Sequence, residues 1–197
     1  MSKAWRITLG ACITWAALSG CSSPPARFYA LSVTGAQTQT PLDVSVAVGP
    51  VTIPAAVDGP RMVLNVGPNE LRPDEYNRWA APLQDDILRT VAANLTMLLG
   101  TARVTLSTNT SGSTPEYRAS IEVERFESVL GQTVTVEAVW SVRRSSDGAV
   151  QSGRTVAHES VSGGGFGALA AAHSRAIAHL SENIAAGVRA LHGAAAG

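Results

Sequence analysis

The chain has 197 residues, of which 45% are hydrophobic and 15% charged, with 15 basic and 15 acidic side chains. This length and composition are typical of a single globular domain with a core of its own. Because the charges are balanced and scattered, the sequence lacks the basic surface that nucleic-acid binding requires. We therefore expect one folded domain that binds no nucleic acid.

The N-terminal segment has the layout of a secretory signal. Lys3 and Arg6 precede an apolar run over residues 7–18, and small residues follow up to Cys21. The run is shorter than the roughly 18 to 20 residues that cross a hydrocarbon core, so we interpret residues 1–20 as a cleaved signal peptide. Its removal leaves 13 basic side chains (15 − 2) against 15 acidic ones.

Residues 18–21, Leu-Ser-Gly-Cys, resemble the lipobox of bacterial lipoproteins. The resemblance implies that Cys21 carries diacylglycerol and an N-acyl chain, which together hold a protein durably at a membrane. The alternative is an ordinary secretory signal with a chance cysteine. Ser22, and not an aspartate, follows Cys21, which favours the periplasmic face of the outer membrane. Cys12 lies in the removed segment, so we expect no disulfide and no cofactor beyond the covalent lipid.

The first half of the mature chain predicts a tether, two extended segments and a helix. Residues 22–27 form a tether that reaches about 20 Å when extended, and the folded domain is expected over residues 28–192. Alternating valines predict a strand over residues 44–53, with a bulge or edge position at Gly49-Pro50. Turn signals flank a second extended run over residues 61–66, which indicates a strand pair.

A helix is predicted to start at Pro82, which fits a first helical turn. Apolar residues recur at three- and four-residue spacing as far as Leu99, and Gly100 ends the helix. A short strand at residues 103–106 and a polar loop at residues 108–115 follow.

Three successive strands and a closing helix complete the domain. Residues 117–123 and 134–142 alternate between apolar and polar, and a turn at residues 146–148 leads to a third strand at residues 151–161. Apolar residues at helical spacing over residues 166–191 predict a cover for this meander, and residues 193–197 are expected to be a disordered tail. The fold class is α+β, a mainly antiparallel sheet with two amphipathic helices packed on one face.

No pattern of catalytic or metal-binding residues emerges. None of the four histidines stands in ligand spacing with a cysteine or carboxylate. His173 falls on the apolar face of the closing helix, where a hydrogen-bonded core histidine is expected. The chain has no Gly-x-Ser-x-Gly elbow, and Gly163-Gly164-Gly165 fits a helix entry better than a nucleotide fingerprint. We therefore expect that the protein is not an enzyme.

Four short motifs occur in a fixed order along the mature chain. They are FYAL at residues 28–31, VGPVTIP at 48–54, DGPRMV at 58–63 and, the most specific, NRWAAPL at 77–83. Together they resemble the PqiC-like family of ABC-type transport auxiliary lipoproteins. The resemblance implies an outer-membrane subunit of an intermembrane phospholipid transport system that docks an MCE-domain protein and its inner-membrane permease and ATPase. It leaves the oligomeric state open, a homo-oligomer included.

Our candidate partner-binding site is the segment that contains Asn77, Arg78, Trp79 and Pro82. A tryptophan and an arginine at a helix entrance resemble an interface anchor. In the alternative interpretation, Trp79 packs against the sheet and sets the angle of the helix. Trp140 lies in the inward phase of its strand and is expected in the core. Two other functions stay open, a structural or assembly lipoprotein of another envelope complex and a periplasmic hydrolase with an unrecognised site.

Overall fold

The computed structural model describes residues 24–34, 40–107 and 114–195, and Cys21 and the predicted signal peptide lie outside this range. The elements in chain order are β1 (Arg27–Tyr29), β2 (Val46–Thr52), the 3₁₀ turn η2 (Ala55–Val57), β3 (Arg61–Gly67), β4 (Glu70–Trp79), α2 (Leu83–Leu99), β5 (Val104–Leu106), β6 (Tyr117–Val129), β7 (Thr133–Arg144), β8 (Val150–Ser160) and α3 (Phe166–Gly193). The α+β prediction is confirmed.

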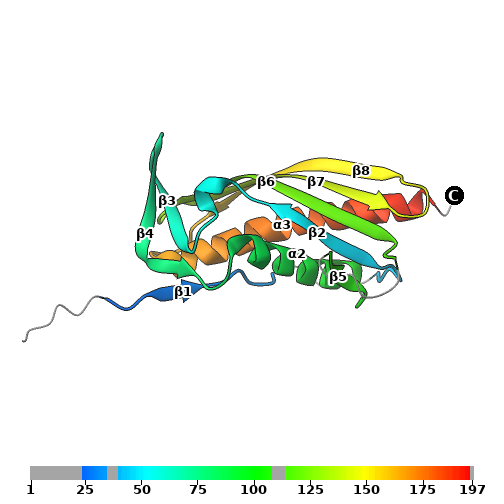
Figure 1. Cartoon of the computed structure of the whole chain (residues 1–197), viewed down its shortest axis with the longest axis horizontal. Coiled ribbons are helices and arrows are strands. Elements are labelled where there is room, and N and C mark those ends of the chain that lie inside the picture. Colours follow the sequence, from blue (N-terminus) through cyan, green and yellow to red (C-terminus); the bar gives the residue numbers. More distant parts are fainter. Residues whose placement is uncertain (1–23, 35–39, 108–113, 196–197) are drawn as a thin grey trace, which may run out of the picture.

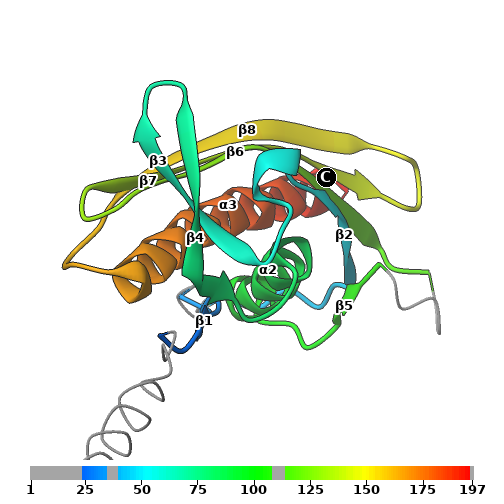
Figure 2. The same ribbon diagram turned by 60° about the vertical axis from the view of Figure 1, so that its left-hand side comes forward.

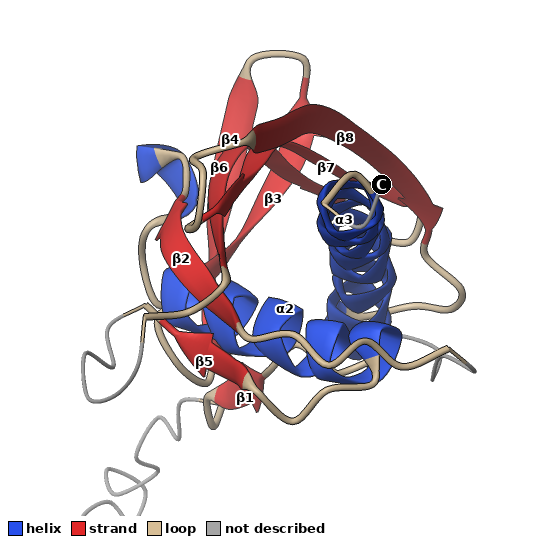
Figure 3. Ribbon diagram, turned by 90° about the vertical axis from the view of Figure 1, so that its right-hand side faces the viewer, coloured by secondary structure: helices blue, strands red, loops and turns tan. Residues whose placement is uncertain are grey.

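The larger sheet has five strands in the order β5-β2-β6-β7-β8. The predicted meander β6-β7-β8 is antiparallel, whereas β2 pairs parallel with both β5 and β6. Figure 3 shows that the sheet curves around the helices, with α3 inside the curve. Alternate residues of β6 and β7 point inward and are buried, as the sequence pattern predicted.

Strand β2 is interrupted at the predicted position. Its register against β6 shifts between Val48 and Val51, and the Gly49-Pro50 peptide bond is cis. Gly49 has φ +116°, and a Cβ there would lie 2.4 Å from Ser107 Oγ. Only glycine fits this position, because a side chain would meet both backbone strain and a steric clash.

Both helices pack on the same face of the five-stranded sheet. Helix α3 contacts β7 and β8, α2 contacts β2 and β5, and the two helices contact each other. Helix α2 ends at Gly100, which adopts the left-handed conformation and donates its N–H to the Thr96 carbonyl. Trp140 is buried between the layers, and a Cβ at Gly187 of α3 would lie only 2.9 Å from its ring. The predicted core position of Trp140 is confirmed.

A second, three-stranded sheet in the order β1-β4-β3 covers one end of the domain. The sequence indicated a strand pair at β3 but gave no bounds for its partner β4, and it assigned residue 27 to the tether, whereas this residue begins β1. The β3–β4 hairpin stands across this end and extends beyond the larger sheet (Figures 1 and 2). The chain enters the domain through β1 at this end, and α3 finishes at the other end. We call the end formed by β1, β3 and β4 the entry end.

Candidate partner-binding surface

The candidate segment joins the second sheet to the first helix. Residues 77–79 are the last residues of β4, and Pro82 directly precedes the first residue of α2. Only the C-terminal part of the segment therefore lies at a helix entrance, whereas Asn77 and Arg78 belong to a strand. Asn77 and Arg78 are half-buried, Trp79 is buried and Pro82 is exposed.

Asn77 stabilises a bulge in β4. Val63 pairs with Pro73 and Arg61 with Arg78, so six residues of β4 oppose three of β3. The Asp74 carboxylate accepts hydrogen bonds from the Asn77 backbone N–H at 2.8 Å, from its side-chain amide at 2.8 Å and from the backbone N–H of Tyr76 at 2.9 Å.

These hydrogen bonds change the acidity of the carboxyl group. Partial burial alone would raise the pKa of Asp74, but the hydrogen bonds from Asn77 and Tyr76 and the nearby Arg72 hold it below the usual 3.8. The Asn77 side-chain oxygen accepts a hydrogen bond from the Tyr29 hydroxyl at 2.9 Å. Asn77 thus links the bulge to β1.

Trp79 lies at the centre of an aromatic cluster. Its side chain is 5% exposed and makes edge-on contacts with Phe126 and His173, at centroid distances of 6.0 and 6.1 Å. Phe126 and His173 stack with centroids 3.9 Å apart and an interplanar angle of 5°. Strand β4, strand β6 and helix α3 each supply one ring, so the cluster fixes the small sheet against the rest of the domain. This burial supports the packing interpretation of Trp79.

His173 is a core residue, as its sequence position predicted. It is fully buried, and its Nε2 lies 2.8 Å from the Ser128 Oγ, while Nδ1 is buried without a hydrogen-bond partner. Burial lowers the pKa of His173 to about 3. The imidazole is therefore neutral at physiological pH and has no access to solvent for acid–base chemistry.

A shallow pocket of about 380 Å³ lies where two of the sequence motifs meet. It is lined by residues 58–60, Asp-Gly-Pro, and by residues 79–82, Trp-Ala-Ala-Pro. The Trp79 backbone N–H donates to the Pro60 carbonyl at 2.8 Å, which holds the two segments together. Because its lining is mostly apolar and carries a single carboxylate, the pocket suits a small apolar side chain of a partner better than a polar substrate.

Arg78 lies in a row with two other side chains on the outward face of the small sheet. Its register partners are Phe28 on β1 and Arg61 on β3, whereas Tyr29 and Trp79 share the opposite, inward face. Phe28 is 63% exposed. The Arg78 Nε is buried without a hydrogen-bond partner, and no carboxylate of the described residues forms an ion pair with Arg61 or Arg78.

The segment after β1 is fixed between the two helices, a feature that the sequence analysis missed. Its backbone N–H groups donate to side chains of both helices, Leu31 to Asp86 at 2.8 Å, Ser32 to Ser174 at 2.9 Å and Thr34 to Asn94 at 3.2 Å. All three acceptor residues are buried. Short polar residues on the inner faces of two otherwise apolar helices were the only sequence signal for this contact.

Within the described ranges, no three His, Cys, Asp or Glu side chains are grouped as a metal site would require. No helix in the same ranges is both long and apolar enough to cross a bilayer.

Residues 29–185 match the family model of ABC-type transport auxiliary lipoprotein components. The chain belongs to this family. The fold is similar to that of an uncharacterised protein of known crystal structure, with a TM-score of 0.69 and 18% identity over 84% of this chain and 99% of that one. It is also similar to protein XCC0632 from Xanthomonas campestris, a DUF330 protein, with a TM-score of 0.67 and 22% identity over 85% of this chain and 97% of that one. No curated protein matches the chain.

Family membership confirms the resemblance that the four motifs indicated. All of them lie within or directly beside the matched range, and in the fold two of them, at residues 58–63 and 77–83, lie against each other at the pocket. The family is one of transport auxiliary components and not a known enzyme family. The acylation of Cys21 lies outside the described residues and stays a prediction, as does the partner-binding role of Asn77, Arg78, Trp79 and Pro82.

Proposed function

We propose that this lipoprotein is held at the periplasmic face of the outer membrane by an acylated Cys21 and docks an MCE-domain protein there. The MCE-domain protein and its inner-membrane permease and ATPase would form an intermembrane phospholipid transport system, to which this chain contributes binding and no catalysis. Membership of the ABC-type transport auxiliary family carries the proposal. The Leu-Ser-Gly-Cys motif and the serine after it support the location.

The pocket at residues 58–60 and 79–82 is the surface that we propose for the partner. Of its lining residues, Trp79 is buried, whereas Ala80 and Pro82 are exposed. Interface hot spots commonly combine a rigid aromatic residue with a small desolvated pocket. The pocket also lies on the entry end, close to the strand through which the anchored chain enters the domain.

Affinity purification of the detergent-solubilised lipoprotein, followed by mass spectrometry, tests the proposal. We expect an MCE-domain protein to co-purify. Ala80→Glu places a charge in the pocket without altering the core and should abolish the co-purification, whereas Ala190→Glu, at an exposed position near the C-terminal end of α3, should not. Thermal melts of both variants establish that they are folded. If the unmodified protein never recovers an MCE-domain protein, the proposed function is wrong.

The same experiment distinguishes the proposed transport function from the second candidate function. A structural or assembly lipoprotein of another envelope complex would share the anchor and the absence of catalytic groups. It would recover other envelope proteins and no permease, ATPase or MCE-domain protein.

A further inference from the structure

The outward face of the small sheet carries an arginine cluster that lacks acidic partners. Arg61 and Arg78 are directly opposite each other on β3 and β4, and Phe28 is the β1 partner of Arg78. Like charges at opposed positions destabilise a sheet unless something compensates them. Neither arginine forms an ion pair with a carboxylate of the described residues.

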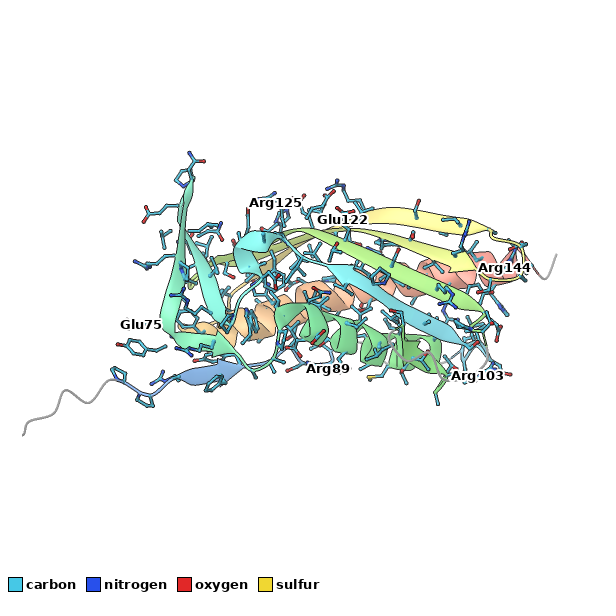
Figure 4. The ribbon with its side chains drawn as sticks, in the orientation of Figure 1. Glu75, Arg89, Arg103, Glu122, Arg125 and Arg144 are labelled. Carbon is cyan, nitrogen blue, oxygen red and sulfur yellow. The ribbon has the colours of Figure 1, made fainter. Side chains whose placement is uncertain are left out.

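The acidic residues nearby do not neutralise this cluster. Asp74 is engaged by the backbone of its own bulge. Asp58, before β3, and Glu75, in the bulge of β4, are exposed and form no ion pair among the described residues. Figure 4 shows Glu75 on the outer side of β4, apart from the ion pairs of the larger sheet. Arginine is well suited to phosphate because its planar guanidinium donates two parallel hydrogen bonds to an anion.

The position of the cluster places it close to a membrane surface when the chain is anchored at Cys21. Cys21 lies six residues before Arg27, so an acyl anchor on Cys21 keeps the start of β1 within about 20 Å of the bilayer surface. Phe28, next to the arginines in the register, exposes 63% of its side chain at the same end. An exposed aromatic ring beside cationic groups is the combination found where proteins lie against lipid headgroups.

We infer that the outward face of β1, β4 and β3 lies against the bilayer that holds the protein's own anchor, with Arg61 and Arg78 on phospholipid phosphates and Phe28 at the headgroup boundary. The inference rests on the acylation of Cys21 in the proposed function. It adds that the domain is oriented on the membrane and not merely tethered to it. The pocket at Pro60 and Pro82 then opens beside the membrane surface, where a partner that delivers lipid would have to reach it.

The test uses the acylated protein in vesicles of phosphatidylethanolamine and phosphatidylglycerol. A fluorophore on Glu75→Cys reports the entry end, and one on Ser146→Cys, in the β7–β8 turn, reports the opposite end. A nitroxide on the lipid headgroup should quench the first fluorophore much more strongly than the second. The mature chain offers no other free thiol, because Cys12 is removed and Cys21 is acylated.

The chain provides a matched control for the charges. Arg118 and Arg143 are also directly opposed, on β6 and β7, without an ion pair among the described residues, but they lie towards the opposite end of the domain. We expect Arg61→Gln with Arg78→Gln to lower the docked-to-undocked ratio about 25-fold, a factor of about five for each arginine. Arg118→Gln with Arg143→Gln should leave the ratio unchanged. High salt, or omission of phosphatidylglycerol, should act like the first pair.

The outcomes separate this inference from the function on which it rests. Acylated protein that shows equal quenching at both ends, or an equal response to the two arginine pairs, overturns the docking face and leaves the anchor intact. An N-terminal peptide with an unmodified Cys21 in mass spectrometry overturns the anchor and the docking face together. Because Arg61 is exposed, Arg61→Gln alone should keep the thermal melt of the unmodified protein and still lower the ratio about fivefold.

Discussion

The two sheets treat the charges on their outward faces differently. In the middle of the five-stranded sheet, Arg154 pairs with Glu124 and Glu137, and Arg125 pairs with Glu127 and Glu137, so these two cations are neutralised within the sheet. On the three-stranded sheet, Arg61 and Arg78 oppose each other with no carboxylate between them. Arg118 and Arg143 oppose each other in the same way on the larger sheet, but towards the end of the domain away from β1. The two opposed arginine pairs therefore differ in their distance from the chain's entry, and our inference assigns an external anion only to the pair beside it.

The largest effect on stability is expected on the inner face of the small sheet. Trp79→Ala removes a buried ring from the cluster with Phe126 and His173 and should lower the free energy of unfolding by about 3–5 kcal/mol. Phe28→Ala, on the outward face of the same sheet, should change it by less than about 0.5 kcal/mol. Denaturant titrations of both variants measure the contrast, and equal losses would contradict the division into an inner and an outer face.

The next effect concerns the segment that follows β1. Asp86→Ala removes the acceptor for the Leu31 N–H and should cost about 1–3 kcal/mol, because the buried amide loses its partner. Asp85→Ala, at the exposed neighbouring position of the same helical turn, is the control. Hydrogen exchange at the Leu31 amide should accelerate in the first variant alone. Unchanged exchange would show that the hydrogen bond does not fix the segment.

A third prediction concerns the pH dependence of stability. The pKa of His173 is near 6.5 in the unfolded chain and about 3 in the folded one, so the unfolded state binds the additional proton between these values. Stability from this residue is complete above pH 6.5 and falls, as the pH drops towards 3, by at most about 1.4 kcal/mol per pH unit.

His173→Gln keeps a polar group for Ser128 but cannot titrate. Thermal melts between pH 7 and about pH 5 should fall less steeply for this variant than for the unmodified protein. Parallel curves would mean that His173 gains protons equally in both states.

The smallest effect is expected on the outward face of the larger sheet. Arg154→Gln breaks the pairs with Glu124 and Glu137, but the arginine side chain is 50% exposed and its interactions are screened by solvent. The loss of stability should stay below about 1 kcal/mol and should vanish at high salt. A salt-independent loss above this value would show that the ion pairs of this sheet are structural.

The parts of the fold with a regular hydrophobic period could be predicted from the sequence. The alternation at Tyr117–Val123 and the helical spacing at Leu83–Leu99 identify one buried face each. The meander and both helices could therefore be predicted. Strand β4 could not be delimited in this way, because Pro73 and the bulge at residues 74–77 interrupt its alternation. Strand β1 has three residues and pairs only with β4, which lies about fifty residues later in the chain.

The candidate site was predictable as a set of motifs but not as an arrangement. The sequence position of Trp79 was compatible with both a buried and a partner-facing role. Its burial became clear only from its contacts with Phe126 and His173, which distant elements supply. The contact between residues 58–60 and 79–82 likewise depends on the pairing of β3 with β4. The opposition of Arg61 and Arg78 depends on the same register, which the bulge sets.

The docked segment of residues 31–34 has a mechanical consequence. The anchor that we propose at Cys21 would be joined to the domain through a strand that runs parallel to β4 and through backbone hydrogen bonds to both helices. A pull on the domain away from the membrane would then be carried by many bonds in parallel. Load applied by a partner assembly would therefore reach α2 and α3 directly. The connection between the proposed anchor and the domain would therefore be stiff and would not act as a flexible tether.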